Sequence, residues 1–138
     1  ARKGGQRAKP QQAPEAGGKA AAGKGAPPPA TLRVSVAKGI PEQRKCTGTY
    51  SLVAGTQPNG APLWRHSRGD RWIYCGSDRH WYVGDADEYE ADFDCCSGYV
   101  RHAGASKGQL PHEAPGTWER FDTRSNQWAK DPSVTAKT

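Results

Sequence analysis

The sequence predicts an all-β fold, a small antiparallel β-meander that closes into a barrel or a sandwich, preceded by an extended basic tail. Three observations predict this fold. Short segments of alternating apolar and polar residues recur along residues 31–138, turn-forming residues separate them at close spacing, and all five Trp, all five Tyr and both Phe lie in that part of the chain. A length of 138 residues leaves room for one hydrophobic core. We expect little helix.

Residues 1–30 differ from the rest in composition, because they contain Gly, Ala, Lys and Pro in short alternation and no aromatic, Leu, Ile or Val residue. Such a segment buries too little apolar surface to offset the entropy lost on folding, so it gains order only by lying on another surface. The prolines at 27–29 favour an extended stem at its end. We therefore predict a tail over residues 1–30 and a Trp-rich β domain over residues 31–138.

The positive charge of the protein is concentrated in this tail, which holds six basic residues against one acidic residue, whereas residues 31–138 hold fourteen and thirteen. The predicted partner-binding residues of the tail are Arg2, Lys3, Arg7, Lys9, Lys19 and Lys24. Dispersed cations suit acidic protein grooves, anionic lipid headgroups or phosphates, with affinity that falls as salt rises. The tail has no aromatic ring to stack on bases, which makes nucleic acid a less favoured partner.

The first strands follow directly after the tail. Residues 32–37 alternate between apolar side chains and polar or small ones, which is the period of a half-buried strand, and Gly39 and Pro41 end it. A second strand is predicted over residues 48–54. The dipeptide Asn59-Gly60 accepts the positive φ angles of a type I′ turn, so it predicts a hairpin to a third strand over residues 63–67.

Two further strands complete a run with short connections. Arg68-Gly69-Asp70 matches a tripeptide read by some adhesion receptors, but Gly and Asp are ordinary turn residues, and we interpret it as a turn. Strands are predicted over residues 71–76 and 81–84, with a turn between them.

The remaining elements are less regular. Six of the ten residues 85–94 are acidic, which predicts a short exposed helix or a loop. Residues 93–102 are expected to be extended, and a long Gly- and Pro-containing loop follows through Gly116. Closing strands are predicted over residues 118–121 and 134–137.

The five tryptophans fall at or near predicted strand positions. Each can bury on the order of 200 Å², so a few of them replace many aliphatic side chains in a small core. We expect most of them in the core. One or two could instead stack on a ligand such as a sugar or a base, and the candidates for such exposed contacts are Trp64, Trp81 and Trp128.

The four cysteines are Cys46, Cys75, Cys95 and Cys96, and three pairings of them are possible. Because disulfides are rare inside cells, we expect a structural, unbridged role. Cys95 and Cys96 are adjacent, so on a strand they would point to opposite faces and at most one would enter the core.

No motif indicates a metal site, a cofactor or a catalytic centre, and we predict a protein that is not an enzyme. The cysteines and histidines lack zinc-ligand spacing. Counted from Asp85 as a calcium loop, the acidic run places Glu90 where glycine is needed and Cys96 where a bidentate Glu is needed. The nucleophile-elbow, phosphate-loop and dinucleotide motifs are absent. No apolar run approaches the roughly 18 residues that cross a bilayer, so we expect no transmembrane segment.

An ordered set of motifs marks the β domain: NG-x-P-x-W at 59–64, RW-x-Y at 71–74, WYVGD at 81–85 and C-x-SGY at 95–99. In these residues the chain resembles a small domain found widely in predicted proteins of dinoflagellate algae. The resemblance covers about residues 31–138 and excludes the tail. It implies a modular binding role with no assigned activity and, for a photosynthetic alga, a peripheral thylakoid location in the plastid.

These observations favour a non-catalytic accessory subunit that docks on a large multi-subunit assembly through its tail and its β domain. The resemblance points to a plastid photosystem–antenna supercomplex as the host, with protein subunits and anionic lipid headgroups as partners. Two alternatives remain open. One is a nucleic-acid-associated protein such as an organellar ribosomal component, and the other is a carbohydrate-binding module.

Overall fold

The computed structural model describes residues 3–7 and 27–138, with the side chains of residues 5–7 outside that description. Its strands, in chain order, are β1 (Gly4–Arg7), β2 (Thr31–Ser35), β3 (Gly48–Leu52), β4 (Trp64–His66), β5 (Trp72–Cys75), β6 (Trp81–Gly84), β7 (Cys95–Gly98), β8 (Val100–His102), β9 (Trp118–Asp122), β10 (Gln127–Lys130) and β11 (Thr135–Lys137). Helix is confined to α1 (Pro41–Arg44), α2 (Ala86–Glu90) and the 3₁₀ turn η2 (Pro58–Gly60) within the described residues. None of these described helices is long and apolar enough to cross a membrane.

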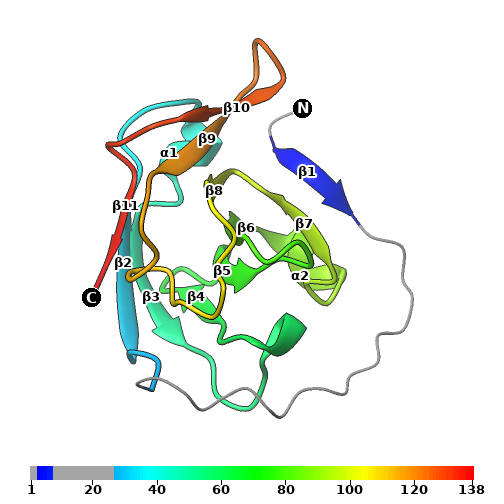
Figure 1. The fold of residues 1–138 in the computed structure, drawn as a ribbon, viewed down its shortest axis with the longest axis vertical. Coiled ribbons are helices and arrows are strands. Elements are labelled where there is room, and N and C mark those ends of the chain that lie inside the picture. Colours follow the sequence, from blue (N-terminus) through cyan, green and yellow to red (C-terminus); the bar gives the residue numbers. More distant parts are fainter. Residues whose placement is uncertain (1–2, 8–26) are drawn as a thin grey trace.

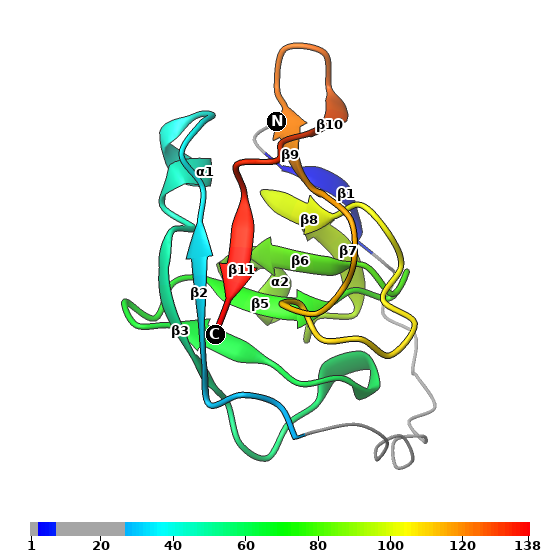
Figure 2. The same cartoon turned by 60° about the vertical axis from the view of Figure 1, so that its left-hand side comes forward.

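Nine of the strands form one antiparallel sheet in the order β10-β9-β8-β6-β5-β4-β3-β2-β11, and this sheet curls into a half-barrel (Figure 1). Strands β2 to β6 follow one another as a meander. The prediction of an all-β, antiparallel fold is confirmed. Figure 2 shows β11 beside β2, the strand with which it pairs at one edge of the sheet. A second, two-stranded sheet joins β1 to β7 on the side of the molecule that also carries α2 (Figure 1).

The predicted strands lie close to the observed ones. β2 alternates between exposed and buried residues as expected, and β6 has the predicted bounds. β3 and β4 pair as predicted, but their connection is longer than a two-residue hairpin loop. Asn59 and Gly60 have the expected positive φ angles, 56° and 80°, yet they lie in η2. Pro58 and Pro62 flank this dipeptide, and because proline has no N–H, the strand ladders cannot extend to it.

The acidic run forms a helix at its start. Asp85 is the N-cap of α2, and Glu88 is buried, which corrects the expectation of a helix exposed along its length. The predicted extended stretch 93–102 is divided into β7 and β8. The sequence analysis missed α1, β10 and β1.

The sheet carries a core on each face. The larger cluster includes Leu32, Val34, Val36, Tyr50, Trp64, Ile73, Trp81, Val83, Tyr99, Val100, Trp118 and Val134. The smaller one contains Leu63, Trp72, Tyr74, Tyr82, Phe93 and Cys95. Every residue of β5 and β6 is buried, because these central strands are covered on both faces.

Four of the five tryptophans are buried, as expected for core residues, and this corrects two of the candidate exposed contacts. Trp64 and Trp81 are 0% and 1% exposed and pack against each other edge to face. Their indole N–H groups donate to the carbonyl oxygens of Pro29 and Gln109 at 2.9 and 2.8 Å. Burial of an indole is favourable once its N–H has such an acceptor, so neither ring is left for a ligand.

The four cysteines lie within the described residues and have free thiols. Cys95 is buried and Cys96 is half-buried, as expected for a pair of which at most one is buried in the core, although Cys96 also packs against the edge of the smaller cluster. Burial raises the pKa of the Cys46 thiol to about 12, so this thiol stays protonated at neutral pH.

Candidate functional site: a groove for an extended segment

The N-terminal segment lies against the domain as an added strand, although about ninety residues of sequence separate β1 from β7. β1 pairs antiparallel with β7, with Gly4 opposite Gly98 and Arg7 opposite Cys95. An exposed strand edge offers a row of unpaired backbone groups, and an extended peptide satisfies them by adding a strand. Residues 3–7 therefore lie along the edge of β7 (Figure 1), and we use the term groove for the surface that they contact, which is formed by this edge, the start of α2 and the rings of Phe121 and Trp128.

Three carboxylates at the start of α2 hold the ammonium group of Lys3. Its Nζ atom lies 2.8 Å from Asp85 Oδ1, 2.9 Å from Asp87 Oδ2 and 3.0 Å from Glu88 Oε2. An ammonium group has three N–H donors and no acceptor, so these three carboxylates match its hydrogen-bonding capacity. The Lys3 side chain is 15% exposed. We call this set of carboxylates the lysine socket.

Local structure fixes the carboxylates of the socket. Asp85 caps α2 by accepting a hydrogen bond from the Asp87 N–H, and the Glu88 carboxylate reaches back to accept one from the Asp85 N–H at 2.8 Å, which together form a capping box. Glu88 also accepts a bond from the Ser97 hydroxyl on β7 at 2.7 Å. Gly84 makes room for it, since a Cβ atom there would fall 2.7 Å from Glu88 Oε1.

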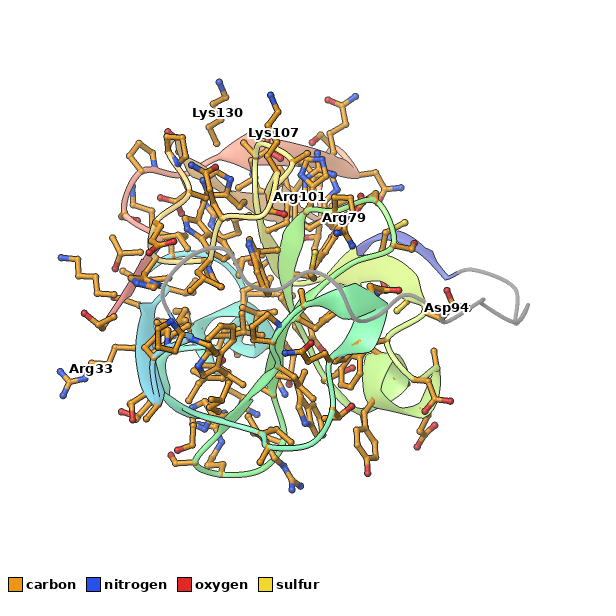
Figure 3. The ribbon with its side chains drawn as sticks, turned by 60° about the horizontal axis from the view of Figure 1, so that its bottom comes forward. Arg33, Arg79, Asp94, Arg101, Lys107 and Lys130 are labelled. Atoms are coloured by element: carbon orange, nitrogen blue, oxygen red, sulfur yellow. The ribbon has the colours of Figure 1, made fainter. Side chains whose placement is uncertain are left out.

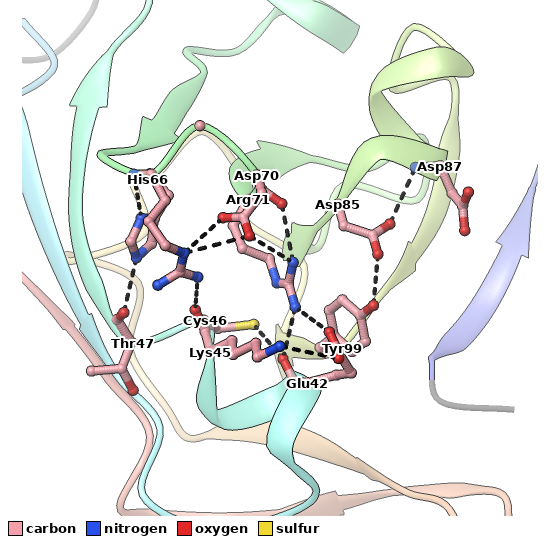
Figure 4. A network of polar contacts seen from close by, with 12 residues as sticks. Glu42, Lys45, Cys46, Thr47, His66, Asp70, Arg71, Asp85, Asp87 and Tyr99 are labelled. Carbon is pink, nitrogen blue, oxygen red and sulfur yellow. Dashed lines mark hydrogen bonds and ion pairs between the residues drawn. The ribbon is translucent and has the colours of Figure 1, made fainter.

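Tyr99 connects the lysine socket to the interior of the domain. Its hydroxyl donates to Asp85 Oδ2 at 2.6 Å. The ring lies 5.5 Å from Lys3 Nζ and 4.7 Å from the guanidinium carbon of Arg71, so two cations contact one aromatic ring. Arg71 in turn pairs with Glu42 of α1 at 2.8 Å (Figure 4). The socket is therefore held by a network that extends from α2 to α1.

The position after Lys3 requires glycine. Gly4 is buried against the rings of Phe121 and Trp128, and a Cβ atom there would fall 2.7 Å from Phe121 Cε1 and 2.8 Å from Trp128 Cε2. These rings pack edge to face at 5.4 Å, and the Arg101 guanidinium lies 4.6 Å from Trp128. We call this contact the glycine seat. Together, the socket and the seat fit a Lys followed by a Gly.

The charges in the groove shift one another's pKa. For Lys3, burial opposes the charged form, but hydrogen bonds to Asp85 and Asp87 outweigh it and raise the pKa. Burial also opposes ionisation of Asp85, yet the bonds from Lys3 and Tyr99 hold its pKa well below the ordinary value of 3.8. Burial dominates at Glu88 and raises its pKa, although Lys3 acts in the opposite direction.

Docking of residues 3–7 should weaken in acid. The pKa of Asp85 in the docked state lies below its ordinary value of 3.8, so docking favours the ionised form of Asp85 and is lost as the pH falls below that value and this carboxylate is protonated. We expect hydrogen exchange of residues 3–7 and 95–98 to stay slow near neutral pH and to accelerate below about pH 4, after correction for intrinsic exchange. Asp85→Asn should flatten this dependence, and an unchanged acid profile in that variant would contradict the assignment.

A second surface feature is an open depression of about 730 Å³ beside α2. It is lined by Val53, Thr56, Gln57, Pro58, Leu63, Arg65, Trp72, Tyr89, Glu90, Asp92 and Phe93. The Tyr89 ring is stacked on Trp72 at 4.8 Å and is 55% exposed. It is the large hydrophobic side chain that the described part of the chain leaves most open to solvent.

The structure describes only some of the predicted site residues. Lys3 lies in the socket and Arg7 ends β1, while Arg2, Lys9, Lys19 and Lys24 lie outside the described residues. Trp128 is half-buried in the glycine seat and contacts this chain's own segment.

Other basic residues of the domain lie on its surface: Arg33, Lys107 and Lys130 extend outward from separate parts of the fold (Figure 3).

Sequence analysis missed the carboxylates of the socket, Tyr99 and Gly4 as functional residues. Two signals were available. The spacing of Asp85 and Glu88 matches a capping box, and the acidic run complements the charge of the tail.

The structure also shows the surroundings of the Arg68-Gly69-Asp70 tripeptide and of the potential metal ligands. The Arg68 side chain pairs with Asp70 at 3.1 Å across the β4–β5 turn, in agreement with a turn role for Arg68-Gly69-Asp70. No cluster of three or more His, Cys, Asp or Glu side chains suited to a metal ion occurs among residues 3–7 and 27–138.

Comparison with known proteins identified no relative of this chain: no family model, no curated protein and no solved structure matches it.

Proposed function

We propose that the chain is a non-catalytic accessory subunit that docks on a large multi-subunit assembly through its tail, residues 1–30, and its β domain. The observation that carries this proposal is the seating of residues 3–7 as an added strand on β7, with Lys3 in the lysine socket. Strand addition with a side-chain pocket is a recognised mode of peptide binding, in which main-chain bonds give affinity and the pocket gives specificity. The domain therefore has the elements of a binding module for extended basic segments.

The host that we propose is a plastid photosystem–antenna supercomplex, with the subunit peripheral to the thylakoid. Its support is the resemblance of about residues 31–138 to the dinoflagellate domain, together with the tail cations Lys9, Lys19 and Lys24, which suit acidic protein surfaces and anionic headgroups.

Gentle solubilisation of native thylakoids tests this proposal. The protein should co-purify with the supercomplex, and lysine-directed cross-linking with mass spectrometry should join Lys9, Lys19 or Lys24 to neighbouring subunits. If the protein elutes alone with residues 8–30 open to protease, the proposal is wrong. Association with ribosomes instead, lost steeply as salt rises, would support the nucleic-acid alternative.

Carbohydrate binding is the second candidate, and the exposed Tyr89 ring in the depression beside α2 favours it. A rigid aromatic face can stack on a sugar ring, and Arg65, Glu90 and Asp92 supply polar groups around it. On a glycan array, this candidate predicts binding that Tyr89→Ala reduces at least tenfold. The matched control is Tyr89→Phe, which keeps the ring and should retain binding. Equal binding by wild type and Tyr89→Ala would exclude the depression as the site.

A further inference from the structure

We propose that the groove beside β7 also accepts residues 3–7 of a second copy of the chain, so that two chains exchange their N-terminal segments. This inference rests on the proposed role of the groove as a binding site for an extended segment. The occupant is defined by chemistry: a lysine for the lysine socket, a glycine for the glycine seat, and an extended backbone for β7.

The contacts that hold the segment are contained within it. β1 pairs with β7 alone and lies outside the nine-stranded sheet. Lys3 supplies the ion pairs, and Gly4 supplies the fit against Phe121 and Trp128. None of these contacts depends on which copy of the chain carries the segment. Exchange in a two-fold dimer would therefore preserve all of them.

The length of the connecting sequence permits exchange. Residues 8–30 separate β1 from β2, and 23 residues can span at most about 80 Å when fully extended. A domain of this size has a diameter of roughly 35 Å, so the segment can reach the groove of a neighbouring copy. Because a connected segment has an effective concentration in the millimolar range, exchange competes with seating of the chain's own segment only where neighbouring copies approach that concentration.

The sequence itself argues for residues 3–7 as the occupant. Lys-Gly occurs four times, at Lys3, Lys24, Lys38 and Lys107. The two later occurrences are already within the folded domain. After Lys24-Gly25, prolines begin at Pro27, where the register of the segment would require backbone donors. Only the first Lys-Gly is followed by three residues that all retain an N–H.

Two full-length variants disable the segment and the groove one at a time. In Gly4→Val, the new side chain collides with Phe121 and Trp128, so the chain's own segment cannot seat and its groove is vacant. In Asp87→Lys, the socket repels Lys3, and the segment is released. Asp87 is 61% exposed, so this change leaves the core intact. Circular dichroism confirms that both variants are folded before they are used.

The first measurement is fluorescence anisotropy of a labelled peptide with the sequence of residues 1–8. It should bind Gly4→Val saturably and bind wild type at least tenfold more weakly, because the wild-type groove holds its own segment. Replacing the peptide lysine that corresponds to Lys3 with alanine should weaken binding at least tenfold. Absence of peptide binding to the folded Gly4→Val chain overturns the proposal.

The second measurement identifies the occupant. When Gly4→Val and Asp87→Lys chains are mixed, native mass spectrometry should show a one-to-one heterodimer that neither variant forms alone and that excess peptide dissolves. If peptide binds but no heterodimer forms, a second copy is not the occupant. Both results are independent of co-purification with a photosystem, so failure of the host assignment and failure of segment exchange are distinguishable.

Discussion

Replacing Lys3 with alanine should release residues 3–7 from β7 while the β domain stays folded. The ammonium group of Lys3 binds three carboxylates at the start of α2, and without it docking would bury part of these carboxylates with no cation to offset the lost hydration. The free energy of unfolding of the domain can fall by no more than the free energy of docking, because the released segment allows water to enter the socket and solvate Glu88. The expected effect is therefore local release rather than unfolding.

Hydrogen exchange measured by mass spectrometry tests this expectation. Exchange of residues 3–7 and 95–98 should accelerate at least tenfold in Lys3→Ala, and trypsin should cleave after Arg7 much faster. The matched control is Lys130→Ala, which removes an exposed lysine on β10 and should leave both rates unchanged. If exchange over residues 3–7 is as fast in wild type as in Lys3→Ala, the docked segment is not a stable feature of the protein.

The strands could be predicted because their signal is local. The alternation in residues 32–36 and the run WYVG at 81–84 specify strands by period and residue type alone. The long sequence separation of β1 and β7 explains why their pairing was not predicted. β1 contains two glycines and no apolar residue larger than glycine, so nothing in its own sequence indicates a strand.

Burial of the tryptophans was predictable as a group but not residue by residue. Trp64 and Trp81 lie in predicted strands and Trp128 lies in none, but all three were candidates for exposed contacts, and their local sequences did not show that the first two lie in the core and the third packs against Gly4. The curl of the sheet decides which ring faces inward, and that curl depends on all nine strands together. In the same way, the acidic run is a solvated stretch by composition, and it becomes a site only because the fold brings Lys3 to it.

Trp64→Ala should have the largest effect on global stability. The indole is fully buried and packs against Trp81, and its N–H donates to the Pro29 carbonyl oxygen. Removal of a buried Trp side chain leaves a cavity and costs about 3–5 kcal/mol, a large fraction of the 5–15 kcal/mol that stabilises a typical domain. Urea denaturation followed by tryptophan fluorescence should show a midpoint shifted strongly to lower urea.

Trp128→Ala provides the contrast, because this half-buried ring borders the glycine seat instead of the core. Its loss should cost the domain much less than the loss of Trp64, but it should accelerate hydrogen exchange over residues 3–7 as Lys3→Ala does. The two tryptophan variants thus distinguish the core role of Trp64 from the role of Trp128 in the glycine seat, which the sequence alone did not distinguish. If Trp64→Ala cost less than about 1 kcal/mol, the ring would not be a core residue, and its earlier interpretation as an exposed ligand contact would be restored.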